Sequence, residues 1–369
     1  MEEFIPQMQP NFGKEEADAC YDYMKSGGWV TEFKKTQELE KMICEYTGAK
    51  HCHMVNNGTI SLSLALLAVG VDVGNKVIVP NMTMIASPNS IGLIGARVKF
   101  VDVDKDTMCM DIDAVENVLR KDKTVKAVMH VSLNTRCNDI IRLKEICNKY
   151  NVALIEDSAQ SLGSFYEGKH LGTFGDIGSF SFSSPKIIST GQGGCLVTDS
   201  DELSNKIYKL KNFGRASGGI DLHDCFGINC KFTDLQAVVG IEQMKKLPWR
   251  VTRMKEIWHL YYNRLHDVSG IEMVASKRDS WIPWFIDIYV DNPKKLLQFL
   301  KTQNVGSRLV YPKITSQPMY ATEEYTQVEY PNTEYWSTRG LWLPSSTVLT
   351  DKNINDICDI IIKYYSDNK

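Results

Sequence analysis

No stretch of this chain is apolar for long enough to cross a membrane. The longest candidate, LSLALLAVGV at 62–71, falls short of the roughly 18–20 residues that a bilayer requires, and we interpret it as a buried helix. The sequence begins MEEFIPQMQP, with acids where a secretory signal would have basic residues before an apolar stretch. Both observations favour a cytoplasmic protein.

A strong excess of charge is also missing. Charged residues make up 24% of the chain, the formal net charge is −3, and the aromatic residues are not accompanied by a basic stripe. Binding to nucleic acid or to an anionic membrane requires a concentrated positive surface, so neither partner is expected. Hydrophobic residues make up 43% of the 369 residues, which is enough for a large core divided between two domains.

The CxxC spacing is absent, although the chain has ten cysteines. Several of them lie inside apolar strand or helix patterns, so we expect reduced thiols. His51-Cys52-His53 is a candidate metal cluster, but alternation along a strand would send the two histidines to one face and Cys52 to the other. We therefore expect no metal here and interpret these residues as a strand. The cysteines are residues 20, 44, 52, 109, 137, 147, 195, 225, 230 and 358.

What the chain does have is a regular alternation of strand and helix patterns over its first two hundred residues or so. This alternation predicts an α/β fold with a mostly parallel seven-stranded sheet flanked by helices, and such sheets bind ligands beyond the carboxyl ends of their strands. Strands are expected at 51–55, 76–80, 97–103, 126–132, 152–157, 179–183 and 194–200, and helices at 12–26, 33–46, 59–69, 84–95, 112–121, 139–150 and 201–212.

The pattern changes after about residue 230, which predicts a smaller α+β domain. We place the large domain at 1–250 and the small C-terminal domain at 251–369. Helices are expected at 232–247, 254–268, 293–303 and 351–365, with a strand pair at 281–290 and an irregular stretch at 311–335.

Lys186 follows one of the apolar strands. A lysine in a loop rich in Ser and Gly is usually a solvated surface residue. Here, however, the apolar pair Ile187-Ile188 turns the loop inward, and three glycines at 191, 193 and 194 allow close approach of the backbone. Loss of water lowers the pKa of a lysine and makes its amine a usable nucleophile.

Asp157 ends the apolar strand VALIED at 152–157. By itself it would be interpreted as a cap for the next turn, because an unpaired buried carboxylate is costly. Together with Lys186 at the same sheet edge it suggests a second role. Asp157 would keep a pyridine nitrogen protonated, while an aldehyde on the same ring would form a Schiff base with Lys186, which is the pattern of pyridoxal 5'-phosphate (PLP) enzymes.

A phosphate site is available between the first strand and the helix that follows it. Gly58 and Thr59 precede this helix, whose free N–H groups and dipole favour an anion. Ser181 and Ser183 lie on one face of their strand and add hydroxyl groups. A Gly-Thr pair is also an ordinary helix start, so its value lies in its agreement with Asp157 and Lys186.

These segments resemble the DegT/DnrJ/EryC1/StrS family of sugar aminotransferases nearly from end to end. EDSAQSLG at 156–163, GDIGSFSFSSPK at 175–186 and TGQGG at 190–194 carry the resemblance in the centre of the chain. NNGTISLSLAL at 56–66, VPNMTMIASPNSI at 79–91, FGINCKFTDLQAVVGIEQ at 226–243, GSRLVYP at 306–312 and LPSS at 343–346 extend it.

The resemblance implies a fold-type I PLP enzyme that works as a homodimer with a shared active site. Lys186 would carry the cofactor and move the proton, Asp157 would pair with the ring nitrogen, and Gln160 would lie near the ring hydroxyl. The phosphate would be held by Gly58, Thr59 and Ser181, with Asn229 reaching in from the other subunit. Some members of the family are dehydratases with His in place of this lysine, so Lys186 favours transamination.

Four features depart from the family pattern. Met84 stands where an aromatic residue is common, although a thioether can still pack against a ring face. LNTRCNDI at 133–140 replaces a Gly-Gln turn, and Lys231 stands where Arg is common and cannot make the same bidentate contact. Thr315 stands about where the family often has His.

We therefore expect transfer of an amino group from glutamate to a nucleotide-linked 4-keto-6-deoxyhexose. The product would be a 4-amino-4,6-dideoxy sugar of the UDP-viosamine or GDP-perosamine type, used in glycan biosynthesis. A 3-aminotransferase of the same family and a non-catalytic protein with this fold are the alternatives. A nicotinamide-dependent oxidoreductase is disfavoured because NNGTISL at 56–62 lacks the Gly-x-Gly-x-x-Gly turn.

Overall fold

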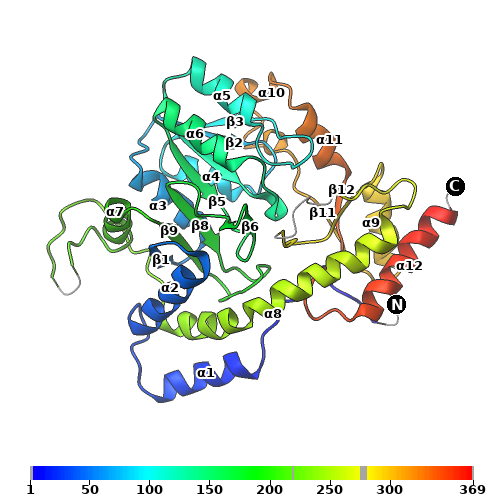
Figure 1. The fold of residues 1–369 in the computed structure, drawn as a ribbon, viewed down its shortest axis with the longest axis horizontal. Coiled ribbons are helices and arrows are strands. Elements are labelled where there is room, and N and C mark those ends of the chain that lie inside the picture. The colour runs from blue at the N-terminus through cyan, green and yellow to red at the C-terminus, as the bar shows by residue number, and fades with distance from the viewer. Residues whose placement is uncertain (1–2, 218–219, 275–280, 368–369) are drawn as a thin grey trace.

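A seven-stranded sheet forms the centre of the computed structural model, which describes residues 3–217, 220–274 and 281–367 (Figure 1). The strand order is β1-β9-β8-β5-β4-β2-β3; β9 is antiparallel to both neighbours, and the other neighbouring pairs are parallel. The predicted mostly parallel sheet is therefore confirmed. Its strands are β1 (His51–Val55), β2 (Lys76–Pro80), β3 (Arg97–Val101), β4 (Val125–Val131), β5 (Ala153–Asp157), β8 (Ile177–Ser181) and β9 (Gly194–Thr198).

Helices cover both faces of this sheet, as the alternating pattern predicted. One face packs against α3, α4 and α7, and the other packs against α5, α6 and the pair α2 and α8. The large-domain helices are α1 (Lys14–Lys25), α2 (Lys34–Thr47), α3 (Gly58–Ala68), α4 (Ala86–Leu93), α5 (Ile112–Lys121), α6 (Ile140–Tyr150) and α7 (Asp201–Lys211). Two short strands, β6 (Phe165–Tyr166) and β7 (Lys169–His170), form a hairpin that the sequence pattern did not indicate.

Local signals fix several of these boundaries. Helix α2 ends at Gly48, which has φ 79° and so adopts the left-handed conformation that glycine accepts without strain. Asp111 and Ser200 cap α5 and α7 by accepting hydrogen bonds from the first turn of each helix. The expected strand over His51-Cys52-His53 is β1, where His51 contacts Asp201 and His53 contacts Ser204.

The predicted break between helices 232–247 and 254–268 is wrong. A single helix, α8 (Asp234–Leu265), continues through Pro248 and runs beneath the sheet toward the C-terminal part of the chain (Figure 1). Its first half packs with α1 and α2, and its second half packs with α12 (Asp351–Asp367). The proposed domain boundary at 250/251 falls inside α8 and stays a prediction.

The C-terminal part is a small three-stranded sheet with helices. Its order is β10 (Asp287–Tyr289), β12 (Gly340–Trp342), β11 (Arg308–Leu309), with α9 (Pro293–Thr302) and α12 in the same core. The expected strand pair at 281–290 is wrong, because only β10 forms there. The stretch expected to be irregular contains η2 (Ile314–Ser316), α10 (Glu323–Thr326) and α11 (Pro331–Arg339), and η1 (Leu133–Thr135) follows β4 in the large domain.

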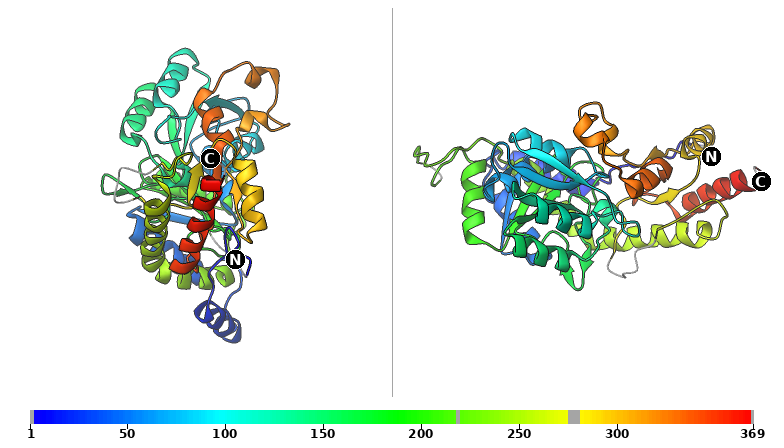
Figure 2. Two further views of the ribbon diagram at one scale, coloured as in Figure 1. Left: turned by 90° about the vertical axis from the view of Figure 1, so that its right-hand side faces the viewer. Right: turned by 90° about the horizontal axis from the view of Figure 1, so that it is seen from above.

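The segment around Ile5 lies against the core of the small sheet. Ile5 donates its N–H to the carbonyl of Asn304 at 2.9 Å and packs in the same hydrophobic cluster as α9 and α12. The right-hand view of Figure 2 shows the N-terminus at this end of the molecule, beside the C-terminal helix. Within the described residues, no helix combines the length and the apolar character needed to cross a bilayer.

Candidate active site

Asp157 is the last residue of β5 and lies at the carboxyl edge of the sheet. Its residue surface is 6% exposed, and its carboxylate accepts hydrogen bonds from the Ser87 hydroxyl at 2.6 Å and from the Ala159 N–H at 3.2 Å. Burial raises the pKa of Asp157, while these two donors and the charge of Lys186 act in the opposite direction. The carboxylate is therefore held in place with a cation nearby.

Lys186 lies in the loop after β8, on the same side of the sheet. Its backbone N–H donates to the Ser183 carbonyl at 3.0 Å, and its Nζ lies 4.3 Å from the centre of the Trp284 ring. Loss of water lowers the pKa of Lys186 to about 8, although the nearby Asp157 carboxylate opposes this shift. The neutral, nucleophilic form of this amine is therefore more accessible near physiological pH than that of an ordinary exposed lysine.

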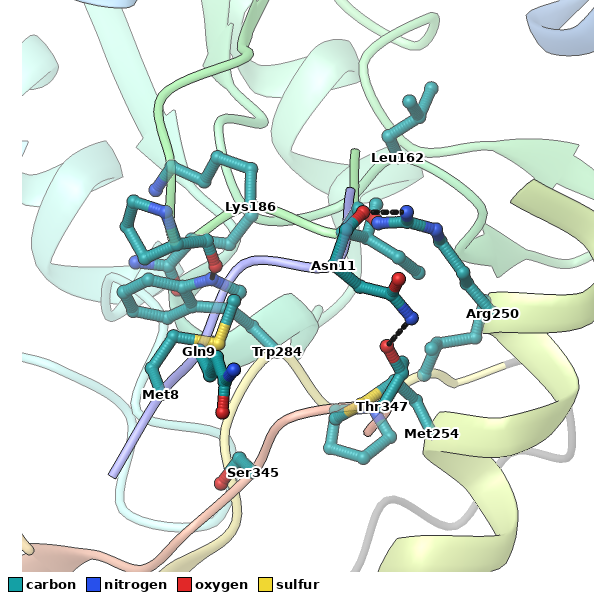
Figure 3. Close-up of a pocket in the computed structure, with 15 residues that line it drawn as sticks. Met8, Gln9, Asn11, Leu162, Lys186, Arg250, Met254, Trp284, Ser345 and Thr347 are labelled. Atoms are coloured by element: carbon teal, nitrogen blue, oxygen red, sulfur yellow. Dashed lines mark hydrogen bonds between the residues drawn. The ribbon is translucent and has the colours of Figure 1, made fainter. Parts of the chain in front are cut away.

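A cavity adjoins Lys186 and lies between the large sheet, the N-terminal segment and the small sheet (Figure 3). Gln160 and Trp284 line it next to Lys186. Arg250 lines its other side and donates to the carbonyls of Ile187 at 2.8 Å and Asn11 at 2.5 Å. Arg250 thus ties the loop that carries Lys186 to the N-terminal segment.

The residues predicted to hold a phosphate come together at the start of α3. Gly58 is the first residue of this helix, and Thr59 follows it, so their N–H groups have no preceding carbonyl within the helix. A Cβ on Gly58 would lie 2.9 Å from the Cβ of Ser181, and a Cβ on Gly194 would lie 2.7 Å from the nitrogen of Gly58. Glycine is therefore required at 58 and 194, and the close packing leaves the helix N-terminus beside the Ser181 hydroxyl.

Gln160 lines the same cavity as Lys186, and its side chain has a protein partner. Its Oε1 accepts the N–H of Asn134 at 2.6 Å. The amide is thereby oriented by the turn after β4, at the wall of the cavity that also contains Lys186.

Met84 and Asn229 are two predicted site residues whose side chains have no described contact with Asp157 or Lys186. Met84 is 43% exposed and lies just before α4, the helix that carries Ser87. Asn229 is exposed in the segment between α7 and α8, where it pairs with Asn212. The roles of all the predicted site residues stay predictions.

Three residues around the site were missed. Ser87 donates to Asp157, Trp284 covers Lys186, and Asn134 binds Gln160. Ser87 is an ordinary residue in the first turn of a helix, and Trp284 is distant in sequence from Lys186. Because LNTRCNDI at 133–140 departs from the family pattern, a left-handed turn at Asn134 could have been suspected. The hydrogen-bond partners of Asn134 could not have been predicted from the sequence.

A lysine and a carboxylate at one sheet edge, beside an open helix N-terminus, define the class of the protein as a fold-type I aminotransferase. The chain belongs to the DegT/DnrJ/EryC1/StrS aminotransferase family, whose model matches residues 10–362. The enzyme class expected from the sequence is therefore confirmed.

Two curated relatives are similar over almost their whole length. GDP-perosamine synthase of Vibrio cholerae is 32% identical over 98% of this chain and 99% of the relative. GDP-perosamine synthase of Escherichia coli O157:H7 is 32% identical over 99% of each chain.

Solved structures of aminotransferases share the fold. The aminotransferase TlmJ of Streptoalloteichus hindustanus superimposes with a TM-score of 0.92 at 26% identity, covering 99% of this chain and 100% of the other. The protein Spr1654 of Streptococcus pneumoniae, solved in its PLP form, gives a TM-score of 0.90 at 26% identity over 99% and 98% of the two chains. The predicted fold class is confirmed.

Proposed function

We propose that this PLP-dependent sugar aminotransferase moves an amino group from glutamate to a nucleotide-linked 4-keto-6-deoxyhexose. The product is a 4-amino-4,6-dideoxy sugar for glycan biosynthesis. The observation that carries the proposal is the presence of Lys186, with a lowered pKa, and buried Asp157 at one sheet edge, beside the N-terminus of α3. The two GDP-perosamine synthase relatives support a perosamine-type product and GDP as the nucleotide to test first.

PLP is the cofactor expected from the sequence, and family membership with the PLP form of Spr1654 confirms it. The residues of this chain fit such a group, because the Gly58–Ser181 contact leaves an anion site at a helix N-terminus and Asp157 is buried close to Lys186. When bound, PLP supplies an aldehyde and an electron-withdrawing pyridine ring.

We assign the parts of the site as follows. Gly58, Thr59 and Ser181 hold the phosphate, and Asp157 keeps the ring nitrogen protonated. Gln160, whose amide is fixed by Asn134, would lie near the ring hydroxyl, and Met84 would pack against the ring. Lys186 would bond the cofactor, and its amine would serve as the acid and base of the transfer.

We also propose a homodimer in which Asn229 completes the phosphate site of the other subunit. The segment between α7 and α8 projects away from the sheet in Figure 1, and it carries exposed apolar side chains at Phe213, Leu222, Phe226 and Ile228. Exposed apolar groups on a projecting segment favour burial against a partner. A second subunit would cover this surface.

The lysine assignment is tested first by spectroscopy and trapping. We expect purified protein to be yellow and, after borohydride reduction, to carry PLP covalently on Lys186, as peptide mass spectrometry would detect. Lys186→Ala should fold normally, lose the covalent link and lose turnover, because its amine is the nucleophile assigned to bond the cofactor. Lys144→Ala, which removes a lysine paired with Asp176 elsewhere on the large domain, is the matched control. Normal turnover by Lys186→Ala would refute the assignment.

The substrate is tested by offering GDP-, UDP- and dTDP-linked 4-keto-6-deoxy sugars with glutamate. We expect turnover with the GDP-linked sugar and an amino group on carbon 4, which NMR of the product would locate. Amination at carbon 3 would favour the alternative within the family. Conversion only with another amino donor would exclude glutamate while leaving the sugar assignment intact.

A further inference from the structure

The turn that follows β4 has an unusual backbone. Asn134 and Thr135 are consecutive residues with positive φ, at 49° and 64°, and both are almost fully buried. Asn tolerates this left-handed conformation, but a β-branched residue such as Thr rarely adopts it. Strain of this kind persists when the surrounding contacts fix it, and it often marks a functional site.

Asn134 uses its polar groups to bind the segment that leads into β10. Its side-chain Oδ1 accepts the N–H groups of Trp284 at 3.0 Å and Phe285 at 2.9 Å, and its Nδ2 donates to the Phe285 carbonyl at 2.9 Å. Its carbonyl accepts the indole N–H of Trp281 at 3.1 Å, and its own N–H binds Gln160. Asn134, at the edge of the large sheet, is therefore hydrogen-bonded both to Gln160, a predicted cofactor contact, and to the segment of the small domain that leads into β10.

The next two residues strengthen the same connection. Thr135 donates its hydroxyl to the Ile282 carbonyl, and the Arg136 guanidinium makes two hydrogen bonds of 2.8 Å to the Asp287 carboxylate. The side chains of Arg136 and Asp287 are 3% and 4% exposed. Bidentate pairs of this kind fix orientation as well as distance.

These hydrogen bonds between the turn after β4 and the segment that leads into β10 determine where Trp284 lies. Its indole packs against Lys186, with the Nζ atom 4.3 Å from the ring centre, and its N–H donates to the Pro185 carbonyl at 2.7 Å. Phe285 stacks behind it, with ring centroids 3.8 Å apart. Figure 3 shows the indole of Trp284 beside Lys186 at one wall of the cavity. The backbone of the lysine loop and the lysine amine are thus both in contact with one side chain of the small domain.

We propose that Asn134 and Trp284 are positioning residues for Lys186: the left-handed turn holds the indole across the amine, where it excludes water and orients the free lysine toward the cofactor. The inference rests on the proposed function, in which Lys186 is the lysine that bonds PLP. It adds two residues, from two domains, that act on this lysine without themselves reacting.

The test measures covalent capture of PLP by the full-length protein after its cofactor has been removed, followed by absorbance over a range of pH. Capture requires the neutral amine, so the midpoint of its pH profile reports the titration of Lys186. Trp284→Leu admits water to the amine, and we expect its midpoint to rise by about one pH unit. The lost contact between the ammonium and the ring acts in the opposite direction and is the smaller effect.

Two further variants separate positioning from folding. Asn134→Gly accepts the left-handed backbone but lacks the side-chain bonds to Trp284 and Phe285, so its midpoint should rise in the same direction. Trp284→Phe keeps an aromatic face over the amine and should restore a profile close to that of the unmodified protein. If Trp284→Leu does not fold, these two variants still decide the question.

The controls are the same substitutions at places that do not contact the lysine. Asn151→Gly changes another left-handed asparagine, with φ 54° at the end of α6, and Trp249→Leu changes a tryptophan that is 50% exposed on α8. Profiles of Asn134→Gly and Trp284→Leu that match these controls would overturn the inference. Covalent capture by Lys186→Ala would instead overturn the assignment of Lys186, a separate and recognisable result.

Discussion

Asp157 is the residue whose charge the proposed chemistry depends on most directly. Asp157→Asn keeps the size of the side chain but removes the charge that would hold a ring nitrogen protonated. We expect kcat to fall by about 100-fold or more, with KM changed little, because the lost interaction matters when negative charge develops during reaction. Steady-state kinetics with the GDP-linked sugar would measure this.

The control for that substitution is Asp111→Asn, which makes the same chemical change at the N-cap of α5. Asparagine caps a helix about as well as aspartate, so activity and stability should both be preserved. A near-normal rate for Asp157→Asn would show that this carboxylate is only a structural acceptor for Ser87 and Ala159.

At the residue scale, the sequence predicts site residues that lie at the ends of strands and misses site residues contributed by distant segments. Lys186, Asp157 and Gly58 could be found because strand ends and helix starts converge at one edge of a sheet. Trp284 could not, because its place over Lys186 depends on Asn134 and not on the local pattern of 281–290. Contacts between distant segments are set by packing, which periodicity does not report.

At the element scale, α8 and β10 show the same competition between local and distant interactions. Pro248 removes a helical hydrogen bond and costs about 3 kcal/mol in a helix interior, which made a break the natural expectation. The helix nevertheless continues, because its two halves pack into the hydrophobic clusters of both domains. A strand pair was expected at 281–290, but only β10 forms, because the N–H groups of Trp284 and Phe285 bind the Asn134 side chain instead of a neighbouring strand.

The connection between the turn after β4 and strand β10 gives a prediction at this scale. Asp287→Asn leaves the buried Arg136 charge without its carboxylate, and we expect the free energy of unfolding to fall by about 3–5 kcal/mol. Denaturant unfolding followed by circular dichroism would measure the change.

An exposed ion pair provides the comparison. Lys206→Ala removes a pair with Glu202 in which the side chains are 49% and 77% exposed, and it should cost no more than about 0.5 kcal/mol. Equal, small losses for Asp287→Asn and Lys206→Ala would mean that water reaches Arg136 and that the turn does not hold the two domains together.

At the scale of the whole molecule, the sequence predicted the layers of the large sheet but not the path of the first residues. Alternating strands and helices are local patterns, so the sheet and its covering helices could be derived from them. The pairing of Ile5 with Val305 joins segments that are far apart in the chain, and no local pattern records it. Contacts between two subunits are equally hard to predict from sequence, because the residues that complete a shared active site come from a second chain.

A shared active site makes a prediction about mixed subunits. In a hybrid of Lys186→Ala and Asn229→Ala chains, one site carries both defects, while the other combines an intact Lys186 with an intact Asn229 from its partner. We therefore expect two nearly inactive proteins to recover activity when unfolded and refolded together, reaching about a quarter of the unmodified level with equal amounts and random pairing. Mixing Lys186→Ala with Thr59→Ala is the control, because Thr59 and Lys186 serve the same site from one chain and no hybrid site is intact. Recovery in both mixtures, or in neither, would contradict an active site completed by Asn229 of a second copy.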